Sequence, residues 1–253
     1  MKVSIITVVY NNAHVIKSAI DSVLSQTYSD IEYIIIDGKS IDGTVAIINS
    51  YGNKITKFIS ELDNGIYDAM NKGLKLATGD IVGILNSDDF YINEFVIEKL
   101  VKVFESKDVD SIYADLVYVK ANNLDRIVRY YDSSYFHPNK FAYGWMPAHP
   151  TFFARREVYL KHGYFKVDYK IAADYELLVR FLFKNSISYC YIPEVLVKMR
   201  MGGVSTSWRS VYINTFEQLR ACKENGIQTS LVKLFYKYPQ KLLGYFKKTK
   251  IIS

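Results

Sequence analysis

The first hundred residues alternate short, almost wholly apolar runs with segments whose apolar residues recur every three to four positions. The apolar runs predict strands at residues 3–9, 32–36, 55–60 and 81–85. The other segments predict helices at residues 15–24, 45–51, 66–77 and 93–104. Strands that are apolar on both faces and alternate with helices are typical of a parallel sheet covered on both sides. The sequence therefore predicts an α/β fold with a mostly parallel sheet flanked by helices.

The pattern changes after about residue 110. A hairpin is predicted at 111–119 and 126–131, and the later strands are predicted at 151–154 and 188–197. Helices are predicted at 155–162, at 174–184 and from Trp208 onward, with Pro239 in the first turn of the last one. We therefore expect a main domain at 1–205, with halves 1–109 and 110–205, and a helical, basic C-terminal extension at 206–253.

The net charge of +6 comes from one end of the chain. Residues 231–253 hold six lysines and no acid, which leaves 26 basic and 26 acidic residues elsewhere. A body without net charge does not suit a nucleic-acid-binding protein. Two cysteines far apart, Cys190 and Cys222, indicate a reducing compartment, and no apolar run has the length to span a bilayer. We therefore expect a cytoplasmic protein that does not bind nucleic acid.

Polar residues follow three of the predicted parallel strands, at the edge where such sheets bind ligands. Tyr10, Asp37 and the pair Asp88–Asp89 are expected to meet in one crevice there. Two adjacent carboxylates at the end of a buried strand repel each other, and a divalent cation would relieve that repulsion. Oxygen ligands suit Mg²⁺ or Mn²⁺ completed by substrate phosphates and water. The alternative is an N-cap of the helix at 93–104.

Three further residues have two interpretations each. No glycine-rich phosphate-binding motif occurs, so Lys72 is a candidate for holding phosphate, or else a plain surface lysine. Asp174 begins an amphipathic helix, either as an N-cap or as an acid facing a cleft with a raised pKa. His149 either lines an acceptor site or is a structural histidine.

Five segments, in their order and spacing, resemble the inverting glycosyltransferases of family 2, which have the GT-A fold. The segments are residues 3–11, 36–44, 63–73, 78–89 and 173–180. Within that family the chain is similar to bacterial capsule, O-antigen and exopolysaccharide transferases. The resemblance implies a Rossmann-like sheet with a nucleotide-sugar half at 1–109 and an acceptor half at 110–205.

The resemblance also implies roles for individual residues. Asp174 matches the general base that deprotonates the acceptor hydroxyl, and Asp88 and Asp89 match the ligands of Mn²⁺ or Mg²⁺. The implied donor-binding residues are Thr7, Val8, Tyr10, Asp37, Asn71, Lys72, Asn86 and Asp88. His149 and Arg180 are candidates for the acceptor side.

The chain departs from the family pattern at two donor-site positions. Asn86 stands where many relatives have the first acid of Asp-x-Asp-Asp, and Gly38 stands where many have a second Asp. Uridine remains the preferred nucleoside. The Gln/Arg-x-x-Arg-Trp motif of processive synthases is absent, which favours transfer of a single sugar. The competing hypotheses are a sugar nucleotidyltransferase and a non-catalytic carbohydrate-binding relative.

The basic end of the chain predicts an amphipathic helix. Leu231, Leu234, Phe235, Tyr238 and Leu242 share one helical face, beside a stripe formed by Lys233, Lys237 and Lys241. Such a helix suits an anionic membrane surface. We therefore expect peripheral binding to the inner face of the cytoplasmic membrane and a lipid-linked glycan acceptor. The alternatives are a helix packed on the body and a dimer contact.

Overall fold

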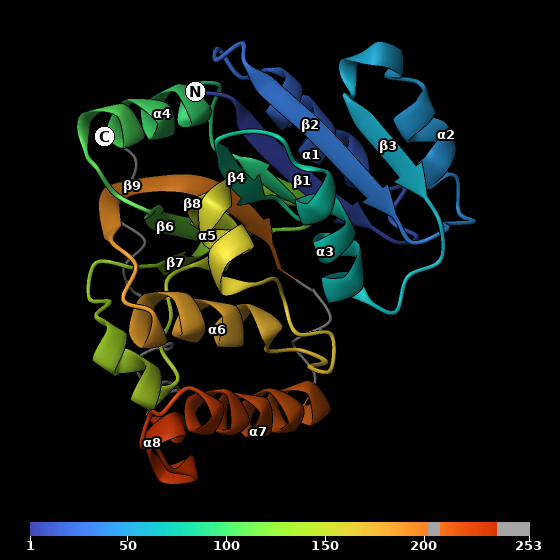
Figure 1. Ribbon diagram of the computed structural model, residues 1–253. Helices are drawn as coiled ribbons and strands as arrows, with labels where there is room; N and C mark the ends of the chain where they lie inside the picture. Colours follow the sequence, from blue (N-terminus) through green and yellow to red (C-terminus); the bar gives the residue numbers. More distant parts are fainter. Residues whose placement is uncertain (202–207, 237–253) are drawn as a thin grey trace.

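Nine strands form one sheet in the residues that the structure, a computed structural model, describes: 1–201 and 208–236 (Figure 1). Their order is β3-β2-β1-β4-β8-β6-β9-β5, and β7 pairs with β6. β7, β8 and β5 run antiparallel to their neighbours, and the other strands share one direction. The strands are β1 (Val3–Val9), β2 (Ile31–Asp37), β3 (Lys57–Ser60), β4 (Ile81–Ile84), β5 (Asp89–Tyr91), β6 (Ser111–Lys120), β7 (Asn123–Tyr131), β8 (Phe153–Arg155) and β9 (Tyr189–Arg200).

Helices cover both faces of this sheet. Side chains of α1 (Ile16–Leu24), α2 (Thr44–Asn49) and α4 (Val96–Ser106) pack on one face. The other face is covered by α3 (Ile66–Leu76), α5 (Arg156–His162) and α6 (Ala173–Leu178), and α7 (Trp208–Glu224) packs against α6. β1 lies between the layers, with Ile5 facing the first and Ile6 the second. The predicted α/β fold with a mostly parallel sheet is confirmed.

The structure differs from the sequence-based prediction after β4. β5 was not predicted, because it is only three residues long and follows the polar residues 86–88. It pairs with β9, a strand more than 100 residues later. The next helix, α4, begins at Val96 and not at Asn93, because the Asn93 side chain accepts a hydrogen bond from the Phe95 amide and forms a turn there.

The helix predicted at 174–184 is present in two parts. The α-helical part, α6, ends at Leu178, and Val179–Lys184 continue it as a π-helix. The short 3-10 helices are Gly52–Lys54, Pro138–Tyr143 and His149–Thr151. The last of these occupies the start of the strand predicted at 151–154, so β8 begins at Phe153.

Two helices of the C-terminal extension are described. α7 lies alongside α6 at the bottom of Figure 1, and it also contacts α8 (Leu231–Phe235). The predicted helix at Pro239 lies outside the described residues, and the domain division at residue 205 stays a prediction. Among the helices of the described residues, none combines the length and apolarity that crossing a bilayer requires.

A buried carboxylate ties the amino ends of the parallel strands together. Glu32 on β2 is 2% exposed and accepts hydrogen bonds from Ser4 Oγ (2.6 Å), the Thr78 amide (2.7 Å) and Lys57 Nζ (3.0 Å). Burial acts to raise the pKa of Glu32, but these hydrogen bonds outweigh it and lower the pKa to about 2. The ionised carboxylate therefore stabilises the fold.

We predict that Glu32→Gln lowers the free energy of unfolding by about 2 kcal/mol at pH 7, because donors around the side chain lose a charged acceptor. The contribution of Glu32 is present above the ordinary carboxyl pKa and is lost as the pH falls toward 2. The difference between the two proteins should therefore shrink in urea unfolding at pH 3. The exposed Glu94→Gln is the control. An equal loss at both pH values would contradict the assignment.

Candidate active site

The loops that follow β1, β2 and β4 meet at the carboxyl edge of the sheet. The Asn11 amide donates to Ser40 Oγ (2.7 Å), and the Asn12 amide donates to Thr44 Oγ1 (3.0 Å). The Asn12 side chain donates to Ser87 Oγ (2.8 Å) in the loop after β4. These bonds join three loops that are distant in sequence. Residues 10–12, 38–44 and 86–88 therefore meet at the edge where the sequence predicts a crevice.

The predicted nucleoside-binding residues differ in what they present at this edge. Tyr10 is 65% exposed, whereas Val8 is buried and the Thr7 hydroxyl accepts a hydrogen bond from Tyr33 within the core (3.1 Å). Asp37 is the last residue of β2 and is fully buried. Its carboxylate accepts hydrogen bonds from the amide and hydroxyl of Ser40 and from the Ser60 hydroxyl. Asp37 therefore shapes the 38–40 loop, and Tyr10 presents its ring to solvent.

Asp63 lies at the same edge, although sequence reasoning gave it no role. A Cβ atom at Gly38 would lie 2.5 Å from Asp63 Oδ2 and 3.3 Å from the Tyr10 ring. Glycine at position 38 thus lets these two side chains approach the β2 loop. The sequence could have indicated a role for Asp63, because it begins the 63–73 segment, one of the five segments that resemble family 2.

Lys72 and Asn71 are both engaged within the fold. Lys72 Nζ is 2.8 Å from Glu61 Oε1 and 3.6 Å from Asp68 Oδ2, and it donates to a carbonyl. The buried Asn71 side chain exchanges two hydrogen bonds with the backbone of Phe165 (2.8 and 3.0 Å). Asn71 therefore joins α3 to the segment before α6. Both donor-binding assignments stay predictions.

The acidic pair at the end of β4 divides into an accessible and a buried carboxylate. Asp88 is partly exposed, whereas Asp89 is 0% exposed at the start of β5. Burial and the charge of Asp88 raise the pKa of Asp89 well above its ordinary value. Asn86 donates to Asp89 Oδ2 (3.1 Å), while Asn86 Oδ1 and Asp89 Oδ1 have no hydrogen-bond partner among the described residues.

This set of oxygens suits a hard divalent cation. Asp88 offers an accessible carboxylate, and two buried oxygens beside it lack donors. No group of three or more His, Cys, Asp or Glu side chains in the described residues could hold a metal ion. A cation here would therefore take its remaining ligands from substrate phosphate and water.

Arg200 holds the acidic loop in place, a role that sequence reasoning missed. Arg200 is 7% exposed, and its guanidinium donates to the Asp88 carbonyl (2.6 Å) and to Ser18 Oγ on α1 (2.6 Å). It also lies over the Phe90 ring, 4.9 Å from its centroid. Arg200 thus brings a fixed positive charge to Asp88 and Asp89. No local pattern links β9 to the β4 loop, so only the folded chain reveals this contact.

Asp174 stands at the same edge of the sheet, in the first turn of α6. The preceding segment runs along α3, because Phe165 contacts Asn71 and the Ile171 carbonyl accepts a hydrogen bond from Tyr67. Tyr67 is in the first turn of α3, which begins at the carboxyl edge. The segment that leads to Asp174 therefore lies beside the first turn of α3, directly after the loop that holds Asp63.

Asp174 is partly exposed as a residue, and burial of its carboxyl raises the pKa to about 6. The Tyr175 amide donates to Asp174 Oδ1 (2.7 Å). The aromatic rings of Tyr67 and Tyr131 are close enough for the charge of Asp174 to raise the pKa of both phenols, after the larger effect of burial. Trp145 packs against Tyr131 at 5.9 Å between ring centroids.

The two candidate acceptor-side residues, His149 and Arg180, both contact groups within the fold and not Asp174. Burial lowers the pKa of His149 to about 4, so its imidazole is neutral at neutral pH, and it packs edge-on to Phe165. Arg180 pairs with Glu176 and donates to the carbonyls of His162 and Tyr164. The guanidinium is thus already engaged between α5 and α6. Neither contact set includes Asp174.

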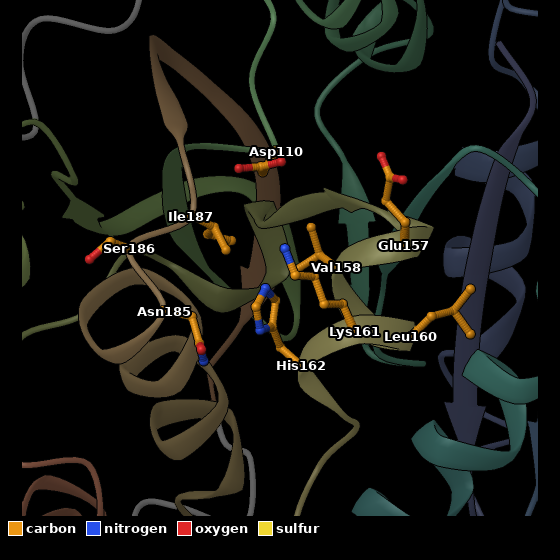
Figure 2. Close-up of a pocket in the computed structure, with 9 residues that line it drawn as sticks. All are labelled: Asp110, Glu157, Val158, Leu160, Lys161, His162, Asn185, Ser186 and Ile187. Atoms are coloured by element: carbon orange, nitrogen blue, oxygen red, sulfur yellow. The ribbon is translucent and has the colours of Figure 1, made fainter.

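A separate cavity of about 660 Å³ lies at the opposite edge of the sheet (Figure 2). Figure 2 shows Asp110, just before β6, facing Lys161 and His162 at the end of α5. Because β6 and β4 run in the same direction, the start of β6 is remote from the loop that carries Asp88. This cavity is therefore not part of the candidate active site.

Comparisons with known proteins agree with this arrangement. Residues 4–163 match the family described as "Glycosyl transferase family 2". A glycosyltransferase of Rickettsia typhi is 31% identical over 226 residues, which cover 87% of this chain and 69% of that protein. A "PGL/p-HBAD biosynthesis glycosyltransferase" of Mycobacterium bovis is 27% identical over 81% of this chain and 79% of its own length.

Solved structures share the fold at low sequence identity. S. aureus TarS 1–349 in complex with UDP-GlcNAc superposes with a TM-score of 0.71 and 16% identity, over 99% of this chain and 76% of that one. The chain spans 44% of the longer TarS structure. The mannosyltransferase PcManGT of Pyrobaculum calidifontis, in complex with GDP-Man and Mn²⁺, gives a TM-score of 0.64 and 17% identity, over 97% of this chain and 73% of that one.

The predicted GT-A fold is thus confirmed by these structures, and the enzyme class by the family match. The chain is a glycosyltransferase that belongs to family 2.

Proposed function

We propose that this glycosyltransferase moves one hexosyl or N-acetylhexosaminyl residue from a nucleotide-sugar to an acceptor hydroxyl, with inversion at the anomeric carbon. The observation that carries the proposal is the environment of Asp174. Asp174 is a partly exposed residue whose carboxyl pKa is raised to about 6 by burial, beside the first turn of α3 at the sheet edge that also holds Tyr10, Asp63 and Asp88. A carboxylate with that pKa is mostly ionised at neutral pH and more basic than an ordinary one.

Asp174 acts as the general base in this proposal. The Tyr175 amide donates to Oδ1, and we assign Oδ2 the proton of the acceptor hydroxyl. The acceptor oxygen forms a bond to the anomeric carbon as the bond to the nucleoside diphosphate breaks on the opposite face. This single displacement inverts the configuration, and the proton remains on Asp174 until it passes to solvent.

Asp88 and its neighbours hold the diphosphate end of the donor. The accessible carboxylate of Asp88 and the free oxygens of Asn86 and Asp89 would hold Mn²⁺ or Mg²⁺. Such a cation stabilises the negative charge that grows on the leaving diphosphate. Arg200 keeps the Asp88 loop in position. TarS with UDP-GlcNAc and PcManGT with GDP-Man and Mn²⁺ support a nucleotide-sugar and a metal, and we take a UDP-sugar as the donor.

The acceptor side of the proposal is a lipid-linked glycan of a surface polysaccharide, reached at the inner face of the cytoplasmic membrane. On α8 and the residue after it, Leu231, Val232, Phe235 and Tyr236 are all exposed, beside the exposed Lys233. Apolar and aromatic side chains next to lysine suit the interface of an anionic bilayer. The other lysines of the predicted stripe, Lys237 and Lys241, lie outside the described residues.

The first experiment tests the donor site with Asp88→Ala. We expect UDP-sugars, more than GDP- or dTDP-sugars, to raise the melting temperature of the wild type when Mn²⁺ is present. The variant should lose this metal-dependent shift and at least about 100-fold in donor turnover, since a cation ligand is gone. Asp108→Asn, fully exposed and remote, is the control. A variant that keeps the Mn²⁺-dependent shift would rule out Asp88 as the ligand.

The second prediction concerns the pH dependence of turnover. Because Asp174 must be ionised to accept a proton, kcat/KM should rise with pH through an apparent pKa near 6. Asp174→Asn should lower kcat by at least about 1,000-fold and leave UDP binding intact. An acidic limb near pH 4, or an active Asp174→Asn variant, would contradict the assignment of the base.

The same pKa predicts a change in stability. The folded chain binds the proton of Asp174 more tightly than the unfolded chain, so stability falls as the pH rises from about 4 to about 6. Asp174→Asn lacks this loss and should be more stable than the wild type at pH 8 by about 1–2 kcal/mol, after allowance for partial exposure. The advantage should vanish near pH 4.5 in urea unfolding; a constant difference would count against the raised pKa.

The membrane proposal is tested by flotation with vesicles that contain phosphatidylglycerol. Replacing Lys233, Lys237 and Lys241 with Gln should weaken binding by up to about 100-fold, because each lysine contributes on the order of 1 kcal/mol near an anionic surface. The matched control replaces the exposed Lys17, Lys54 and Lys75 with Gln, which gives the same change in net charge. Equal flotation of both triple variants would show that the basic end has no special role.

A further inference from the structure

One carboxylate of α7 binds the segment that leads into the helix of Asp174. Glu217 Oε1 accepts a hydrogen bond from the Lys170 amide (2.7 Å). Glu217 Oε2 accepts from the amides of Ile171 (2.9 Å) and Ala172 (2.8 Å). Ala172 immediately precedes α6, and Asp174 is the second residue of that helix. Three consecutive backbone donors are therefore fixed by a single side chain.

These donors depend on Glu217. Ala172 is buried, so its amide would have little access to water if the carboxylate were absent. Hydrogen bonds to an ionised acceptor are stronger than those between neutral groups. On the other side of the segment, the Ile171 carbonyl accepts a hydrogen bond from Tyr67 of α3. Ile171, three positions before Asp174, is thus held by α7 through its N–H and by α3 through its C=O.

The surrounding face of α7 is directed at the same segment. Arg220, one turn after Glu217, pairs with Asp168, and Glu224 pairs with Lys166 at 2.7 Å. Tyr169 also donates to Glu224 (3.0 Å). Residues 217, 220 and 224 lie on one face of a helix. This face of α7 therefore contacts residues 166–172 over two turns, and only Glu217 contacts the three amides that precede α6.

We propose that Glu217 is a positioning residue for Asp174, through the three amides that it alone on this face of α7 contacts. The inference rests on the proposed role of Asp174 as general base. Glu217 does not touch the reacting atoms. It holds residues 170–172 so that α6 begins at the place where Oδ2 of Asp174 faces the acceptor. The family match ends at residue 163, before either residue.

The charge of Glu217 supplies a second, independent readout. Burial is the main cause of the raised pKa of Asp174, and the negative charge of Glu217 raises it further. The phenols of Tyr67 on α3 and Tyr131 on β7 are also close enough to interact with Asp174, and both are neutral at neutral pH. Removing the charge at position 217 should therefore lower the pKa of Asp174 and shift the acidic limb of the rate profile to lower pH.

The test uses the full chain and measures release of UDP from UDP-GlcNAc and UDP-glucose with Mn²⁺, together with hydrogen–deuterium exchange of the backbone. Glu217→Gln should lower kcat by about 10- to 100-fold with the KM for the donor unchanged within about twofold. Its acidic limb should lie at lower pH than that of the wild type, and the amides of 170–172 should exchange faster. Glu217→Ala should show a larger loss of kcat.

Glu224→Gln is the matched control on the same helix. It removes one charge that pairs with Lys166 and Arg220 but leaves the amides of 170–172 bound. It should keep the acidic limb, the exchange rates at 170–172 and kcat within about threefold of the wild type. Equal losses in both variants would assign Glu217 to general packing of α7 and overturn the proposal. An unshifted acidic limb and unchanged exchange in Glu217→Gln would also overturn it.

Asp174→Asn, measured alongside, separates this proposal from the proposed function. If Asp174→Asn retains wild-type turnover, the assignment of the base fails, and the positioning role fails with it. If Asp174→Asn is inactive while Glu217→Gln behaves as the wild type in rate and pH profile, the base stands and the role of Glu217 alone is rejected.

Discussion

The site depends on the parallel pairing of β1 with β2 on one side and with β4 on the other. Parallel strands end at a common edge, so the residues that follow them become neighbours even when they are 75 positions apart, as Asn12 and Ser87 are. At the opposite edge, Glu32 stabilises the same pairing through Ser4 and Thr78. Hydrogen bonds between the loops then close the arrangement. The positions of Tyr10, Asp37 and Asn86 follow from this pairing, because each of them lies at the end of one of the paired strands or within two residues of it.

Sequence patterns predicted those parts of the fold that have a local signal. The apolar runs of β1, β2 and β4 and the periodic faces of α1 and α3 placed the parallel half correctly, with boundaries that differ by a few residues. β5 has no such signal, because its three residues form a strand only by pairing with β9. The start of α4 at Val96, later than the predicted Asn93, likewise has no local signal. It depends on a turn in which the Asn93 side chain binds the Phe95 amide and competes with helix formation.

The candidate site shows the same limit. The acids Asp37, Asp88, Asp89 and Asp174 were recognisable because they follow apolar strands or begin an amphipathic helix. The exposure of these acids could not be predicted. Asp37 and Asp89 are buried in the structure, whereas Asp88 is partly exposed. Arg200 and Glu217 were missed because their partners lie 112 and 45 to 47 residues away. Contacts of that kind arise from the packing of β9 and α7 and leave no periodic trace in the sequence.

The environments of these carboxylates explain why one of them suits proton transfer. Hydrogen bonds from Ser4, Thr78 and Lys57 outweigh the burial of Glu32 and keep its pKa at about 2, which makes it a poor base. Asp37 is enclosed, with its oxygens bound to Ser40 and Ser60. Burial is the main cause of the raised pKa of Asp174. The backbone amides of Tyr175 and of Asp174 itself offset it only in part, and the negative charge of Glu217 adds to it. Its pKa of about 6 therefore results from incomplete compensation of a buried charge, and this raised pKa makes Asp174 a stronger base than Glu32.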